Sequence, residues 1–89
     1  MIINFAPVSM RASYTLAVAG DSIYINGKQH RLADLAGAVA NEQPMPAFVA
    51  TATEDSVTVI LPYWGDAPNS VLFPTPVVNP ADGPVRMPS

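Results

Sequence analysis

An alternation of large apolar and smaller residues, broken by two tight turns, is the feature that most constrains this chain. Leu16 and Val18 fall on one face of an extended segment that ends at Gly20-Asp21, and Ile23 and Ile25 resume the alternation. A two-residue turn at Gly20-Asp21 pairs Val18 with Ile23 and places all four aliphatic side chains on one face. The segment therefore predicts an antiparallel hairpin.

A second turn signal, Asn26-Gly27, follows at once. Both central residues of a type I′ turn need a positive φ, which Asn-Gly tolerates best, so a third strand over Lys28–Leu32 should return antiparallel. This strand carries Lys28 and Arg31, which are typical of an exposed sheet edge. Residues 14–32 therefore predict a three-stranded meander.

Three further segments complete the expected body of the domain. Ile2–Phe5 predicts an N-terminal strand, and Ala33–Ala40 favours either a short helix or an irregular loop. A second hairpin is expected from Ala47–Thr53 and Ser56–Leu61 around a turn at Glu54-Asp55. Its expected register places these six side chains on one face: Phe48, Ala50, Ala52, Val57, Val59 and Leu61.

Beyond Leu61 the chain becomes rich in proline. Seven of its ten prolines lie from Pro62 onward, where a residue without an N–H weakens any sheet ladder. Only Ser70–Phe73 has room for a strand, and Val77-Val78 could add a short edge. We expect one domain over residues 1–89, all-β or β-dominated with at most one short helix. Residues 62–89 should form an extended arm that packs on the domain or on a neighbouring chain.

Composition narrows the classes of partner. The 89 residues are 12% charged, about half the usual share of a soluble domain. Four basic residues and a net charge of −3 do not suit nucleic acid, and no uncharged stretch is long enough to cross a membrane. With no cysteine there is no disulfide or thiolate site. Low charge beside an Ala-rich core predicts a homo-oligomer, joined through an edge strand or the arm.

The polar residues do not form a recognisable catalytic set. His30 is the sole histidine, with only Asp34 near it in sequence, and it is expected at the surface. Gly20-Asp21-Ser22 has the form of a hydrolase motif but is followed by a strand, so a turn explains it better. Glu54-Asp55 should be a solvated turn. We therefore predict no catalytic, cofactor-binding or metal-binding residues and no enzyme activity.

The Tyr63-Trp64 loop is the most suggestive segment, because it follows a strand and holds the sole tryptophan. Trp64 could cover one end of the core, anchor a protein contact, or offer a platform for a small ligand. The residues predicted to take part in an interaction are Tyr63, Trp64, Phe73, Val77 and Val78.

Short motifs spread over residues 13–85 give a resemblance. They are Gly20-Asp21-x-x-x-Ile25-Asn26-Gly27 with Leu32 and Leu35, then Leu61-Pro62, Phe73-Pro74-x-Pro76 and the run from Asn79 to Val85. In this order they resemble a group of small proteins of unknown function encoded in tailed phages and bacterial prophages. The chain departs from that group at Tyr63-Trp64, where a histidine often stands, and in its Ala-rich segment 33–43.

The resemblance implies a context rather than an activity. It suggests a protein made in the bacterial cytoplasm, found there or in the virion, that contacts itself or other phage or host proteins. The expected function is that of a non-enzymatic accessory protein, such as a minor virion component or an assembly factor. The alternative is a small ligand- or carbohydrate-binding module that uses Tyr63 and Trp64.

Overall fold

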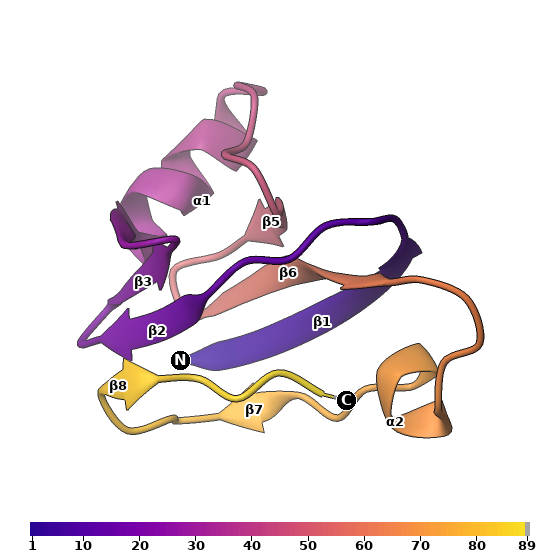
Figure 1. The fold of residues 1–89 in the computed structure, drawn as a ribbon. Coiled ribbons are helices and arrows are strands. Elements are labelled where there is room, and N and C mark those ends of the chain that lie inside the picture. Colours follow the sequence, from indigo (N-terminus) through magenta and orange to yellow (C-terminus); the bar gives the residue numbers. More distant parts are fainter. Residues whose placement is uncertain (89) are drawn as a thin grey trace.

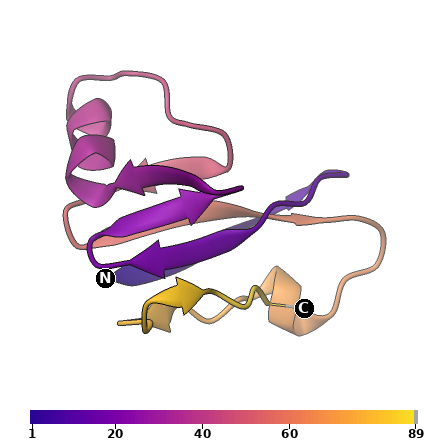
Figure 2. The ribbon, with the colours of Figure 1, turned by 60° about the vertical axis from the view of Figure 1, so that its left-hand side comes forward.

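Two four-stranded β-sheets stack on each other in this computed structural model, which describes residues 1–88. Sheet A has the order β5-β6-β1-β7 and sheet B the order β4-β3-β2-β8. The strands are β1 (Ile2–Ser9), β2 (Leu16–Ala19), β3 (Ser22–Ile25), β4 (Lys28–Arg31), β5 (Val49–Ala52), β6 (Ser56–Tyr63), β7 (Val77–Val78) and β8 (Gly83–Pro84), and the helices are α1 (Leu32–Ala40) and α2 (Asn69–Leu72). Figures 1 and 2 show α1 at one open side of the stack and the C-terminal arm at the opposite side. The prediction of a β-dominated fold is confirmed.

The meander of sheet B has the predicted register. Val18 pairs with Ile23 across the first turn, and Ile23 pairs with His30 across the second. Asn26 and Gly27 have φ values of 53° and 82°, as a type I′ turn requires. The third strand ends at Arg31, one residue earlier than expected, because Leu32 begins α1. β4 is an edge strand with both of its charged residues exposed.

Sheet A is organised by a parallel pair that the sequence did not predict. β1 continues to Ser9, four residues past the expected end at Phe5, and all eight of its residues pair with β6. The register sets Ile3 beside Val57 and Phe5 beside Val59. Apart from this pair, the strand pairs of both sheets are antiparallel. A parallel pair needs a long connection, and here the whole of sheet B lies between β1 and β6 in sequence.

Two prolines, Pro7 in β1 and Pro62 in β6, lie inside these paired strands, and the pairing continues past both. Ile2 N–H donates to Asp55 O at 2.9 Å and Met10 N–H to Tyr63 O at 2.9 Å, so even-numbered residues of β1 turn their backbone groups toward β6. The nitrogen of Pro7 therefore faces the opposite edge of β1. There β7 pairs only with the first two residues of the strand, and no ladder bond is lost.

The second hairpin has the expected turn and a different register. Ala52 pairs with Val57 and Thr51 with Thr58, as expected, but Val49 then pairs with Val59 across a bulge at Ala50. A β-bulge adds one residue to one strand and so reverses which side chains face inward. The prediction that Ala50 shares a face with Ala52 and Val57 is consequently wrong: Val49 is buried on that side and Ala50 is exposed.

The segment between the two sheets forms a helix rather than a loop. Leu32 and Leu35 are spaced one turn apart and are the buried residues of α1, so a short amphipathic stripe holds the helix in place. The helix starts where Leu32 N–H donates to Asp21 O at 3.0 Å. α1 packs against β4 and β5, and so closes one open side of the stack.

The proline-rich arm contributes an edge strand to each sheet. Ser70–Phe73, expected as a strand, is instead largely the single helical turn α2, which buries Val71. Val77-Val78 forms the expected short edge, pairing with β1, and Gly83-Pro84 pairs with β2. Gly20 N–H donates to the Asp82 carboxylate at 2.9 Å. The arm thus packs on the domain along both sheets.

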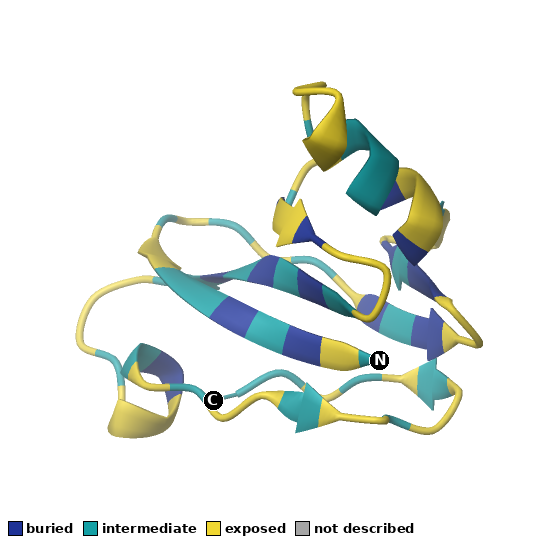
Figure 3. Ribbon diagram, turned by 180° about the vertical axis from the view of Figure 1, so that it is seen from behind, coloured by how far each residue is buried: buried dark blue, intermediate teal, exposed yellow. Residues whose placement is uncertain are grey.

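The hydrophobic core lies between the two sheets. The buried side chains alternate along the strands, so each sheet presents one face inward (Figure 3). Sheet A contributes Ile3, Phe5, Val49, Ala52, Val57, Val59 and Leu61, sheet B contributes Leu16, Val18, Ile23 and Ile25, and the helices add Leu32, Leu35 and Val71.

Tyr14 ties the β1–β2 connection to sheet A. Its hydroxyl donates to Ile60 O at 2.5 Å, and its ring stacks on Phe48 with centroids 4.3 Å apart. Ile60 N–H donates to Phe48 O, just before β5 begins, so the Tyr14 hydroxyl continues the bonding of β6 beyond the end of β5. Burial raises the pKa of Tyr14 to about 12.

Neighbouring isoleucines test the two-face arrangement of β1. Ile3 is fully buried and Ile2 is 38% exposed. Ile3→Ala should lower the free energy of unfolding by about 2–5 kcal/mol, because it leaves a cavity in the core. Ile2→Ala should cost about 1 kcal/mol. Urea unfolding at low micromolar concentration measures both; equal losses would contradict the assigned faces.

The raised pKa of Tyr14 predicts a loss of stability in alkali. The folded state holds the phenol proton more tightly than the unfolded chain, whose pKa is about 10. The contribution of Tyr14 to the free energy of unfolding should therefore be fully present below pH 10 and be lost as the pH rises from 10 to 12. Thermal unfolding of the wild type and Tyr14→Phe across this range measures the effect. Parallel curves for the two proteins would show that Tyr14 is not its source.

Candidate interaction surface

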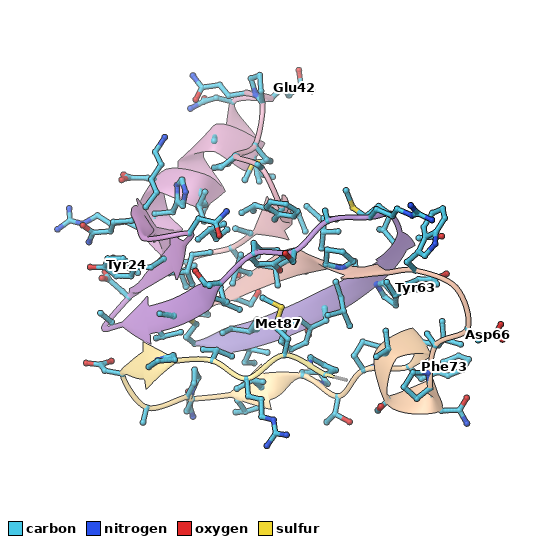
Figure 4. The ribbon with its side chains drawn as sticks, in the orientation of Figure 1. Tyr24, Glu42, Tyr63, Asp66, Phe73 and Met87 are labelled. Atoms are coloured by element: carbon cyan, nitrogen blue, oxygen red, sulfur yellow. The ribbon has the colours of Figure 1, made fainter. Side chains whose placement is uncertain are left out.

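The five residues predicted to take part in an interaction lie in three places. Tyr63 ends β6 and Trp64 begins the loop after it; Phe73 follows α2; Val77 and Val78 form β7. Figure 4 shows Tyr63 and Phe73 near the same end of the molecule, where β6 leads into the loop and α2. Val77 pairs with Ile3 and packs on the core, whereas Val78 pairs with Ile2 and is 62% exposed.

Trp64 does not cover the core. Its side chain is 61% exposed, so the first of its three sequence interpretations is wrong. The guanidinium carbon of Arg11 lies 4.3 Å from the centre of the Trp64 ring system. Such a cation–π contact at an exposed site is worth about 0.5–1 kcal/mol. The contact restrains an exposed aromatic group and joins the β1–β2 connection to the loop after β6.

Phe73 lines an open groove between α2, β7 and the end of the arm. At 77% exposed, it is the most exposed large hydrophobic residue that the structure describes. The groove has a volume of about 460 Å³ and is lined by Ser70, Phe73, Thr75, Val77, Arg86, Met87 and Pro88. Its walls are therefore largely apolar, and Arg86 is the charged group among them. Sequence reasoning missed Arg86 and Met87, because no local pattern indicates that the chain end returns to β7.

A second cleft lies beside the β3–β4 turn. It has a volume of about 410 Å³, and Lys28 and His30 line it together with Ile25, Asn26, Pro46 and Ala47. The pKa of His30 is lowered, first by partial burial and then by the charge of Lys28. The lowered pKa favours the neutral imidazole, so the cleft offers an anion little beyond the Lys28 ammonium group. The bulk of the positive charge in this cleft therefore comes from Lys28.

The polar residues considered for catalysis stay apart. Ser22 is 2% exposed, and its hydroxyl accepts a hydrogen bond from Gln29 Nε2 at 3.1 Å. Glu54 and Asp55 are exposed at the β5–β6 turn, where Asp55 N–H and Ser56 N–H donate to Thr53 Oγ1. Across residues 1–88 no three His, Cys, Asp or Glu side chains gather into a metal site. None of the helices in that range is long and apolar enough to span a membrane.

The other apolar surface is the outer face of sheet A, which the sequence did not single out. Ile2 and Val8 are 38% and 39% exposed there, next to the exposed Val78. The period-2 pattern of residues 2–9 could have indicated this face, had the strand been followed beyond Phe5.

Comparison with protein-family models, curated proteins and solved structures finds no match to this chain.

The Arg11–Trp64 contact can be tested with the intrinsic fluorescence of the sole tryptophan. Arg11→Ala removes the guanidinium from the ring face, so acrylamide should quench Trp64 more efficiently. The free energy of unfolding should change by less than about 1 kcal/mol. Arg31→Ala, which removes an exposed arginine on β4, is the matched control and should leave quenching unchanged. Identical quenching in all three proteins would contradict the contact.

Proposed function

We propose that this chain is a non-enzymatic phage or prophage accessory protein, a minor virion component or assembly factor, that acts through protein–protein contacts. The observation that carries the proposal is the exposure of Phe73 and Trp64, at 77% and 61%. Large aromatic side chains are costly to leave in water, and they are the commonest energetic anchors of protein interfaces.

The groove beside Phe73 supports a protein partner. Its apolar walls suit an aliphatic or aromatic side chain, and Arg86 at its border suits a carboxylate of the same partner. Trp64 leaves β6 near the same end of the molecule, and its contact with Arg11 limits the freedom that binding would remove. A partner segment of a few residues with one apolar anchor and one acidic group fits this arrangement.

The proposal predicts that aromatic substitution removes binding without unfolding the protein. Proteins are captured from phage-bearing bacteria with the wild type, with Phe73→Ser and with Trp64→Ser. The control is Val39→Ser, at an exposed position of α1. A partner identified with the wild type is then purified and titrated. Phe73→Ser should weaken its affinity by about tenfold or more, and Val39→Ser should not. Wild-type affinity in both aromatic variants would overturn the proposal.

The phage context has a test of its own. A gene for an accessory protein should lie among virion-assembly genes, and the protein should be found by mass spectrometry in purified particles or in assembly intermediates. A gene outside any phage-like cluster would contradict the context and leave the binding surface to be judged by the titration.

A carbohydrate- or ligand-binding module is the second candidate, favoured by the exposure of Trp64. Sugars stack on a free aromatic face, and the Arg11 guanidinium occupies one face of this ring. Titration of Trp64 fluorescence with a glycan panel tests the idea. A saturable change that Phe73→Ser retains, together with calorimetric binding of the same glycan that Trp64→Ser abolishes, would favour this candidate over the protein partner.

A further inference from the structure

All four strands of sheet A lack charged side chains. The eleven Asp, Glu, Lys and Arg residues lie in turns, connections, helix α1, the arm and β4, and β4 belongs to sheet B. Exposed sheet edges usually carry charges that prevent pairing with other strands, and exposed apolar patches on a sheet face mark a contact surface. Sheet B follows that rule at its edge with Lys28 and Arg31, and sheet A does not.

The outer face of sheet A is an uncharged β surface. The strand pairing places these residues on it: Ile2, Asn4, Ala6 and Val8 from β1, Ser56, Thr58, Ile60 and Pro62 from β6, Thr51 from β5 and Val78 from β7. Ile2, Val8 and Val78 are exposed hydrophobic residues. Viewed from behind, in Figure 3, neither α1 nor α2 lies over β1. The helices cover other parts of the sandwich.

We propose that this face binds the same face of a second copy of the chain, forming a two-fold symmetric dimer. A two-fold contact needs only one self-complementary patch. A neutral face has no charge to match a charged partner, and burying the partner's charges against it would be unfavourable. Two copies bring identical twists, and twisted sheets pack face to face with their strands about 30° apart.

The charges of the chain are placed so that this contact leaves them in water. Glu54 and Asp55 lie in the turn at one end of β6 and Asp66 in the loop beyond its other end. They would therefore border the interface rather than enter it. Because each copy carries a net charge of −3, the two copies repel at long range, and added salt should screen that repulsion and tighten the dimer.

Asn4 and Thr58 lie side by side near the centre of the face and are half-buried. An amide group both donates and accepts hydrogen bonds, so Asn4 can pair with its counterpart across a two-fold axis. A central polar pair of this kind fixes register, as it does in other symmetric assemblies. The remaining contacts on the face are aliphatic or hydroxyl-bearing.

The area of the outer face limits how strongly two copies can associate. Strands spaced about 4.8 Å apart with a rise of about 3.3 Å per residue give roughly 350 Å² per copy in projection. That area belongs to the small, reversible class of protein interfaces. So small a contact leaves little free energy beyond the entropy lost on association, so the monomer should prevail at low micromolar concentration and the dimer should form only at roughly tens to hundreds of micromolar.

Sedimentation equilibrium from 10 µM to 1 mM, at low and high salt, tests the proposal. The wild type should dimerise, more tightly at higher salt. Thr58→Lys should weaken the dimer by at least about tenfold, because two like charges meet near the axis. Ala19→Lys adds the same charge at an exposed position of sheet B and should leave the dimer intact. An equimolar mixture of Thr58→Lys and Thr58→Glu should restore dimerisation.

Several results would overturn the dimer. One is a wild type that stays monomeric at 1 mM, and another is a dimer that survives Thr58→Lys, since a strand edge or the arm would then join the copies. Circular dichroism of each variant shows whether it folds, and recovery in the mixture cannot come from unfolded chains. Phe73→Ser and Trp64→Ser should dimerise normally. The dimer through sheet A and partner binding at the groove can therefore be contradicted independently of each other.

Discussion

The parallel pairing of β1 with β6 is the constraint on which the rest of the structure depends. It runs over all eight residues of both strands and sets Ile3 and Phe5 beside Val57 and Val59 at the centre of the core. Because parallel neighbours cannot be joined by a tight turn, the chain between them is free to build sheet B and α1. The same pair turns Ile2 and Val8 outward, so one register defines both the core and the uncharged outer face.

The proline-rich arm adds only a short edge strand to each sheet. β7 and β8 pair over only two residues each, and the residues between and after them lie along the open side of the sandwich. Short edge strands offer little for another chain to pair with. The prolines therefore limit strand pairing with the arm, and exposed apolar side chains lie instead on the outer face of sheet A and in the groove beside Phe73.

Local chemistry made much of sheet B predictable. Asn26-Gly27 and Gly20-Asp21 fix two tight turns, and each turn sets a register that follows the alternation of the flanking residues. The bulge at Ala50 was not predictable in this way, because a single extra residue leaves the composition of the strand unchanged and reverses its faces. The exposure of Trp64 was not predictable for a related reason. It depends on the path of the β1–β2 connection, whose Arg11 contacts the ring.

The sequence alone determined that this chain forms a small β-dominated domain with a meander, a second hairpin and a proline-rich arm. These features rest on turn residues and period-2 patterning, which act between neighbours in the chain. Only the tertiary structure decided that β1 lies parallel to β6, that the arm edges both sheets, and which side of Val77-Val78 faces water. Those contacts join residues more than fifty positions apart, and their free energy comes from burying apolar surface that no local pattern assigns to a particular partner.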